Sequence, residues 1–299
     1  MVGAKKKRLG AGWVLLFVIL GLSDFALILK ILLRNKNIAL FAPKGLIANQ
    51  QHSLMMYVVL VLLIIALPAL FTLFYTAWKY RESNTKAKYK SDGRRGKSFV
   101  VVMWVIPTTF MLIIASAMFP ATHKLAPQKS LDSDVKPLTI QVISLRWKWL
   151  FIYPDQQIAT VNFVQIPVNT PVQFEMTADE TPMSSFWIPN LGGQLYTMTS
   201  HVNSLNLKAD TIGDYPGSTP EINGAGFTGM KFTTRVSDSN DFDHWVSKVQ
   251  QSTNILDSTI YEGLLKPSEN NPIVYYSAYV NNLYNNVIIK YQGPGGHAH

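Results

Sequence analysis

The sequence predicts a membrane protein: an α-helical hairpin of two spans, preceded by an N-terminal signal or anchor helix and followed by an all-β sandwich with C-terminal helices. Three observations predict this fold class. The 299-residue chain is 48 % hydrophobic and only 15 % charged, whereas about a quarter of the residues in a soluble domain are charged. Two of its uncharged runs are long enough to cross a bilayer. After Pro127 the pattern changes to short alternating stretches, which are typical of a sandwich.

Charge and cysteine content narrow the classes of function. Residues 1–130 carry 18 Lys and Arg against 3 Asp and Glu, whereas residues 131–299 carry 9 against 15. The basic excess flanks the apolar runs, so it predicts membrane topology and argues against a nucleic-acid partner. The chain has no cysteine, which excludes disulfides, thiolate metal sites, cysteine nucleophiles and a lipidated N-terminal cysteine.

Residues 1–36 are expected to form a signal sequence or an anchor helix. Four basic residues, Lys5 to Arg8, precede an apolar run from Leu9 to Ser23, which is the shape of a secretory signal. Asp24 and Lys30 interrupt a second apolar stretch, and no small-x-small cleavage site follows. Cleavage and retention both stay open, and both predict the same orientation for the rest of the chain.

Residues 37–125 are expected to form a two-helix transmembrane hairpin. The runs Leu54–Trp78 and Ser98–Phe119 contain no charged residue and exceed the roughly 20 residues that a ~30 Å hydrocarbon core requires. The loop 79–98 between them has eight basic and two acidic side chains. The positive-inside rule therefore places this loop in the cytoplasm and everything after Ala121 in the periplasm.

Residues 126–237 are expected to form the periplasmic β-domain. The segment RWKWLFIYP places Trp147, Trp149, Phe151 and Tyr153 two residues apart, so their side chains share one face of a strand. This stripe is either sandwich core or a docking surface for a partner. Strands are predicted at 138–144, 158–166, 171–177, 204–209 and 229–236.

Residues 238–299 are expected to form a C-terminal helical extension with a flexible tail. Asp238 or Ser239 is predicted to cap a helix with Phe242, Trp245 and Val249 on one face. A last helix is predicted around Asn281 to Tyr291, and the tail QGPGGHAH is expected to be disordered.

The stretch GAGFTG, residues 224–229, matches the glycine spacing of a dinucleotide-binding fingerprint. That fingerprint must follow a buried strand and open a helix, because the helix N-terminus supplies the phosphate site. Here DYPGSTPEIN before it is expected to be a loop and MKFTTRV after it a strand. The sequence therefore argues against nucleotide binding.

A family resemblance accounts for this stretch and for several longer motifs. A two-helix hairpin followed by a β-domain with WKWLFIYP, ATVNFVQIPVNTPV, SSFWIPNLGGQLYTM and GFTGMKF resembles subunit II of haem–copper terminal oxidases. Within that family it most resembles the bo-type ubiquinol oxidase branch, over roughly residues 40–292. The resemblance implies a cupredoxin-like sandwich.

In the cytochrome c oxidase branch this domain holds a binuclear copper centre. Its ligands are two Cys, two His, a Met and a backbone carbonyl, with soft thiolates bridging the metals. The resemblance places Ser184 where the first His would stand and Gly226 near the first Cys, with Met230 at the end of a shortened loop. We therefore expect no catalytic, cofactor-binding or metal-binding residue in this chain, and we interpret GAGFTG as the remains of a ligand loop.

The resemblance implies a non-redox subunit of a proton-translocating ubiquinol oxidase in a bacterial inner membrane. Ubiquinol would be oxidised in the membrane, and haems and copper in subunit I would reduce oxygen to water, with subunits III and IV as further partners and lipid around the spans. The aromatic stripe together with Phe186 and Trp187 is predicted to contribute to the domain core and to subunit contact. Phe99 occupies the position, five residues before Trp104, at which many relatives carry a Glu implicated in proton entry.

Three alternatives accompany this interpretation. A copper-containing cytochrome c oxidase subunit is excluded by the absence of cysteine. A membrane-anchored binding or assembly module without a catalytic partner would show the same sequence features. Menaquinol could replace ubiquinol, because a partner subunit would select the quinone.

Overall fold

The structure is a computed structural model that describes residues 38–86, 95–131, 133, 135–181 and 183–292, together with residues 20, 23, 24, 27 and 30. The predictions for the signal or anchor helix, for the middle of the basic loop (residues 87–94) and for the C-terminal tail lie largely outside these residues. The chain divides into one unit of residues 1–42, which includes the short helix η1 (Ala39–Phe41), and a second unit of residues 43–299.

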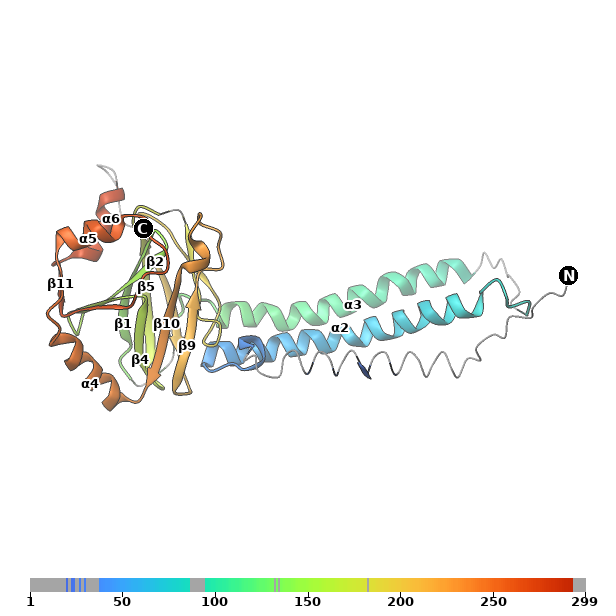
Figure 1. Cartoon of the computed structure of the whole chain (residues 1–299). Coiled ribbons are helices and arrows are strands. Elements are labelled where there is room, and N and C mark those ends of the chain that lie inside the picture. The colour runs from blue at the N-terminus through green and yellow to red at the C-terminus, as the bar shows by residue number, and fades with distance from the viewer. Residues whose placement is uncertain are drawn as a thin grey trace. The chain divides into compact units, whose positions relative to one another are not determined.

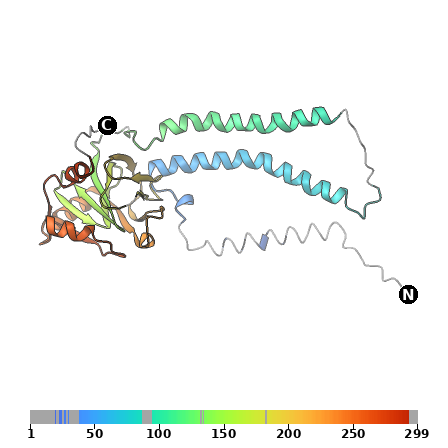
Figure 2. The ribbon, with the colours of Figure 1, turned by 90° about the horizontal axis from the view of Figure 1, so that it is seen from above.

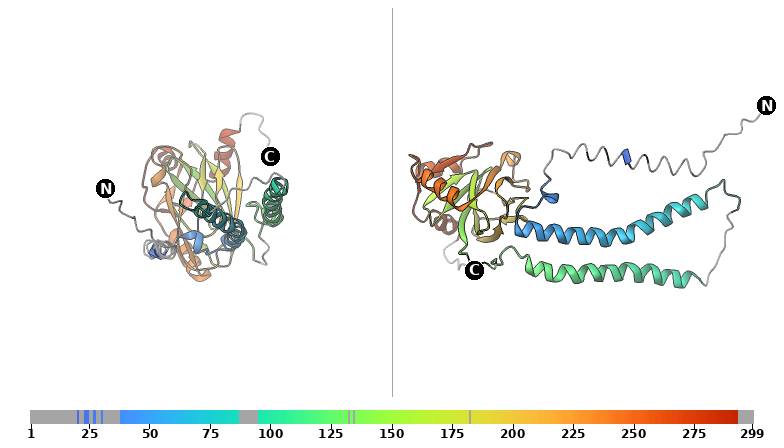
Figure 3. Two further views of the ribbon diagram at one scale, coloured as in Figure 1. Left: turned by 90° about the vertical axis from the view of Figure 1, so that its right-hand side faces the viewer. Right: turned by 90° about the horizontal axis from the view of Figure 1, so that it is seen from below.

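Two helices form the hairpin (Figure 1), and both are long and apolar enough to cross a membrane. They are α2 (Leu46–Lys79) and α3 (Arg95–Lys124), and they contain the two predicted spans. Both continue through internal prolines, Pro68 and Pro107, as spanning helices tolerate. The two helices run alongside one another (Figure 2), and the end-on view in the left panel of Figure 3 shows them as two separate coils.

A six-stranded sheet forms the centre of the β-domain. Its strand order is β12-β3-β2-β1-β5-β8. Strand β1 pairs antiparallel with β2 and parallel with β5. The bounds are β1 (Leu138–Leu145), β2 (Lys148–Tyr153), β3 (Ile158–Val161), β5 (Pro171–Ala178), β8 (Asn203–Lys208) and β12 (Val274–Tyr276).

A three-stranded sheet of order β4-β10-β9 forms the second layer of the sandwich. Its strands are β4 (Phe163–Pro167), β9 (Gly213–Ser218) and β10 (Lys231–Ser237). The predicted single strand 158–166 is therefore wrong: Asn162, with a φ of 56°, divides it, and its two halves join different sheets. Asparagine tolerates this left-handed conformation better than most residues.

Different elements pack against the two faces of the six-stranded sheet. One face packs against the three-stranded sheet and α4 (Ser239–Gln250), through an apolar core that contains Trp149, Phe151 and Phe232. The opposite face packs against α5 (Ser258–Leu265) and α6 (Leu283–Tyr291), through a second core that contains Leu150 and Ile152. Figure 1 shows α5 and α6 on the side away from β9 and β10. Strand β2 is thus buried on both sides.

Several elements differ from the sequence-based expectation. The segment DYPGSTPEIN is not all loop, because β9 occupies residues 213–218 and pairs antiparallel with β10. The C-terminal extension is not purely helical: β12 joins the large sheet, and β11 (Ile255–Leu256) pairs with β13 (Ala278–Tyr279). The predicted helices are confirmed as α4 and α6, and the Asp238 carboxylate caps α4 by accepting a hydrogen bond from Asp241 N at 2.8 Å. The fold class is also confirmed.

Candidate functional site

A hydrogen-bonded cluster occupies the position that the resemblance assigns to the copper centre. Ser184 begins β6 (Ser184–Phe186), which pairs with β7 (Leu195–Thr197), and Met230 precedes β10. The side-chain amide of Asn223 lies between them. Its Nδ2 donates to Ser184 Oγ at 2.8 Å and to Met230 Sδ at 3.3 Å. Ser184 and Met230 are completely buried and Asn223 is 6 % exposed. We refer to Ser184, Asn223 and Met230 as the Asn223 cluster.

The donors in this cluster do not fit a binuclear copper centre. A hydroxyl, an amide and one thioether provide neither a bridging thiolate nor an imidazole. Across the described residues, no group of three or more His, Cys, Asp and Glu side chains is arranged to hold a metal ion. His201 is exposed, and its Nδ1 lies 3.2 Å from both Thr199 O and Ser200 Oγ. The arrangement cross-links the loop to the strands.

The glycines of GAGFTG allow the loop to pack against the Trp147 ring. A Cβ added to Gly226 would lie 2.5 Å from that ring and 2.6 Å from Glu269 Cγ. Gly224 has a φ of +127°, and a Cβ there would lie 3.0 Å from the same ring. After a single turn, η2 (Phe227–Gly229), the chain enters strand β10. The segment therefore opens a strand, as predicted, and lacks the helix N-terminus of a phosphate site.

Most of the predicted contact aromatics lie inside the sandwich. Trp149, Phe151, Tyr153 and Phe186 are completely buried, and Phe186 stacks on Phe232 with ring centroids 5.0 Å apart. Side chains without exposed surface cannot contact a separate subunit, so these four contribute to the domain core. Trp147 and Trp187 are partly exposed. Trp147 lies in the turn before β2 rather than in the strand, and has a φ of 64°. For these two residues subunit contact stays a prediction.

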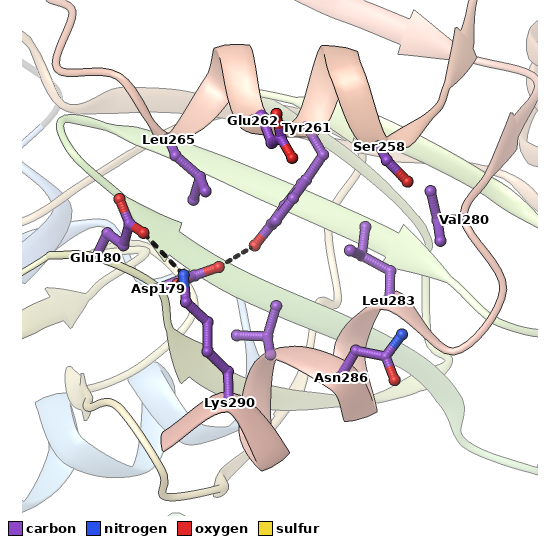
Figure 4. Close-up of a pocket in the computed structure, with 11 residues that line it drawn as sticks. Asp179, Glu180, Ser258, Tyr261, Glu262, Leu265, Val280, Leu283, Asn286 and Lys290 are labelled. Atoms are coloured by element: carbon purple, nitrogen blue, oxygen red, sulfur yellow. Dashed lines mark hydrogen bonds and ion pairs between the residues drawn. The ribbon is translucent and has the colours of Figure 1, made fainter.

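A second polar cluster joins the C-terminal helices to the sandwich (Figure 4). It is centred on Asp179, which follows β5 and whose side chain is 1 % exposed. The carboxylate accepts hydrogen bonds from Tyr261 OH and Tyr291 OH, both at 2.6 Å, and from Lys290 Nζ at 2.9 Å. Lys290 also pairs with Glu180 at 2.9 Å. We refer to Asp179, Tyr261, Lys290 and Tyr291 as the Asp179 cluster.

Burial and hydrogen bonding shift the pKa values in this cluster. Burial, followed by the hydrogen bond to Asp179, raises the pKa of Tyr261 far above its usual value. Burial lowers the pKa of Lys290, but the hydrogen bonds to Glu180 and Asp179 outweigh this effect, and the net pKa is raised. A cavity of about 490 Å³ borders the cluster and is lined also by Leu265, Leu283 and Asn286.

Lys148 provides a second link to the extension. The residue is 1 % exposed, and its Nζ donates to Leu264 O and Lys266 O, both at 2.8 Å. These carbonyls end α5, where backbone acceptors lack helical partners. Burial lowers the pKa of Lys148, yet the two carbonyls and the negative end of the helix dipole stabilise the ammonium form.

Comparison with known proteins identifies the family. The cytochrome bo(3) ubiquinol oxidase subunit 2 of Pseudomonas putida is 42 % identical over 263 residues, which are 88 % of this chain and 83 % of the relative. This chain belongs to the ubiquinol oxidase subunit 2 family. The ubiquinol oxidase subunit 2 of Acetobacter aceti is 39 % identical over 83 % of the chain and 81 % of the relative. The resemblance drawn from the sequence motifs is confirmed.

Two further matches cover only parts of this chain. Residues 250–295 match the family model described as COX Aromatic Rich Motif, and this segment contains α5, α6 and the residues that bind Asp179. The periplasmic domain of subunit II of cytochrome oxidase from Bradyrhizobium japonicum matches with 22 % identity and a TM-score of 0.37, over 40 % of this chain and 96 % of that domain.

Sequence reasoning pointed to Ser184 and Met230 but missed Asn223, which joins them, and it missed the contacts of the Asp179 cluster. Asn223 belongs to no recognisable sequence motif. Only its position, seven residues before Met230 in a glycine-rich loop, could have drawn attention to it. Asp179 lies 82 residues from Tyr261 and 112 from Tyr291, so no local pattern indicates the contact. Phe99 lies within α3, but its side chain is outside the described residues, and its link to proton entry stays a prediction.

Proposed function

We propose that this chain is the non-redox subunit 2 of a proton-translocating respiratory ubiquinol oxidase. The observation that carries the proposal is the similarity to named ubiquinol oxidase subunits along 88 % of the chain. The donor set at Ser184, Asn223 and Met230 supports the same conclusion, because it does not suit a metal that would accept electrons from a soluble donor.

In this proposal the chemistry takes place in a partner subunit. Subunit I would hold the haems and copper, oxidise ubiquinol within the membrane and reduce oxygen to water, and subunits III and IV would complete the complex. The chain is then part of an oxidoreductase without itself touching the reacting atoms. Its contribution is to bind and position subunit I, with the partly exposed Trp147 and Trp187 as contact residues.

The proposed location is the bacterial inner membrane, with α2 and α3 as spans and the β-domain in the periplasm. The basic loop between the helices supports a cytoplasmic hairpin turn. The first residues after α3, together with the whole sandwich, would then lie above the outer surface of the membrane.

The test is purification of the tagged chain from native membranes in mild detergent, followed by subunit analysis and visible spectroscopy. We expect a haem-containing subunit to co-purify in a fixed ratio and to show a carbon monoxide-sensitive reduced spectrum. Recovery of the chain alone, or with haem-free partners only, would contradict the proposal and would favour a membrane-anchored binding module.

A further inference from the structure

An amphiphilic cavity of about 370 Å³ lies between the first turns of α2 and the last turn of α3. Its apolar lining includes Leu54 and Leu125, and its polar lining consists of Asn49, Gln50, Ser53 and Lys124. None of the functions discussed above uses this cavity.

Of the described residues that line the cavity, Lys124 is the only one with a charged side chain. Among the described residues, no ion pair or hydrogen bond engages its ammonium group. Asn49 is held by a hydrogen bond from its Nδ2 to Asp210 Oδ2 at 2.7 Å, and Ser53 Oγ donates to Asn49 O at 2.9 Å. The cavity therefore presents one uncompensated positive charge and the Gln50 amide beside an apolar wall, which is complementary to an anion with an apolar tail.

With α2 and α3 spanning a membrane, the cavity would lie at the depth of lipid headgroups. Residues 46–53 precede the uncharged run Leu54–Trp78, and residues 121–125 follow the run that ends at Phe119. Helix α2 has 34 residues, which at about 1.5 Å per residue makes it roughly 50 Å long, well beyond a ~30 Å hydrocarbon core. Its first turns must therefore extend into the polar layer, where basic side chains meet lipid phosphates.

We propose that this cavity binds the phosphate of a membrane phospholipid, with the ammonium of Lys124 on the phosphate and the acyl chains directed along Leu54 into the bilayer. None of the described residues that line the cavity carries a carboxylate, which favours a headgroup with net negative charge, such as phosphatidylglycerol, over a zwitterionic one. The proposal requires only that α2 and α3 span a membrane, so it does not depend on the oxidase assignment.

The experiment measures phosphatidylglycerol retained by the full chain when it is released from detergent micelles in native mass spectrometry. We expect Lys124→Gln to weaken retention about fivefold, the effect of one basic residue near an anionic surface. Lys124→Arg should retain the lipid, because the charge is kept. Lys129→Gln is the matched control: it removes the same charge five residues away, outside the cavity, and should leave retention unchanged.

Three results would overturn the proposal. Equal retention by the Lys124→Gln and Lys129→Gln variants would show that the cavity charge is irrelevant. Displacement of the lipid by millimolar inorganic phosphate would indicate a site for the free anion. Displacement by a short-chain ubiquinone would indicate a quinone site. Circular dichroism of each variant, if unchanged, shows that a loss of retention does not come from unfolding.

Discussion

The Asn223 and Asp179 clusters join distant parts of the same domain in different ways. At the first, a neutral amide connects Ser184 of β6 to Met230 before β10. At the second, a buried carboxylate connects the end of β5 to two helices through two hydroxyls and an ammonium group. The neutral cluster lies where the resemblance places a metal, and the ionic cluster joins the sandwich to the segment that matches the aromatic-rich family model.

This difference shows which connection depends on charge. The Asn223 amide is neutral and has no titrating group, so the loop that it anchors should stay in place over a wide range of pH. A buried carboxylate is stable only while its donors remain in place. The attachment of the extension should therefore be both the more costly to break and the more sensitive to pH.

The largest expected effect is that of Asp179→Ala. The substitution leaves two tyrosine hydroxyls without their acceptor inside the protein, and it should lower the free energy of unfolding by about 3 kcal/mol. Lys290 is 41 % exposed and can turn to water, so the loss should not be larger. Urea unfolding of the full chain in detergent, followed by tryptophan fluorescence, measures it.

Glu180→Gln is the matched control for that experiment. Its carboxylate also pairs with Lys290, but the side chain is 48 % exposed, and surface ion pairs contribute about 0–1 kcal/mol. Equal losses for the two variants would contradict the assignment of the linkage to the buried carboxylate.

Gly226→Ala tests the glycine loop. The new Cβ would lie 2.5 Å from the Trp147 ring, so the loop or the ring must move, and we expect a loss of about 2 kcal/mol. Gly263→Ala is the control, because its Cβ meets nothing within 4 Å and alanine favours the helix by up to about 1 kcal/mol. If Gly226→Ala were as stable as the native chain, close packing would not explain the glycines.

Alkaline pH should distinguish the two clusters. A tyrosine whose pKa is raised in the folded state gives stability that is complete below about pH 10, its unfolded pKa, and is lost as the pH rises. Lys290, whose pKa is also raised, acts in the same direction above its own unfolded pKa. Tyr261→Phe should reduce the slope of stability against pH above pH 10 by up to about 1.4 kcal/mol per pH unit.

Asn223→Ala is the control for this measurement. Above about pH 10 its slope of stability against pH should equal that of the native chain, because no group in the Asn223 cluster titrates in this range. A changed slope for Asn223→Ala, or an unchanged one for Tyr261→Phe, would contradict the division into a neutral and an ionic cluster.

The smallest expected effect is the stability loss of Asn223→Ala itself. Removing the amide breaks its bonds to Ser184 and Met230, but Asn223 Oδ1 is buried without a hydrogen-bond partner among the residues that the structure describes, and this cost disappears with the side chain. We expect a net loss of about 1 kcal/mol, measured by urea unfolding. Ile222→Ala, at a neighbouring side chain that is 75 % exposed, should change stability by less than about 0.5 kcal/mol. If Asn223→Ala lowered the free energy of unfolding by more than about 3 kcal/mol, the amide would contribute more to stability than its two contacts indicate.

Local patterns predicted the elements that depend on local physics. Hydropathy located both spans, a capping aspartate located α4, and alternation located β1, β5 and β10. The motifs also identified the family. Through that resemblance they singled out Ser184 and Met230, which the structure places in one cluster.

The remaining features depend on contacts between residues far apart in the sequence. Strand β9 contains Pro216 and Gly217, which disfavour strands locally, and it is held by pairing with β10. Lys148 alternates with apolar residues like an exposed position, yet α5 covers it and accepts its hydrogen bonds. The split at Asn162 depends on how two sheets diverge, which alternation alone cannot show.

The most direct test of the central claim is oxygen consumption by the complex purified through this chain. Supplied with ubiquinol, the complex should consume oxygen, and supplied with reduced cytochrome c it should not, because the cluster of Ser184, Asn223 and Met230 offers electrons no entry. Oxygen consumption with cytochrome c and none with ubiquinol would contradict the account.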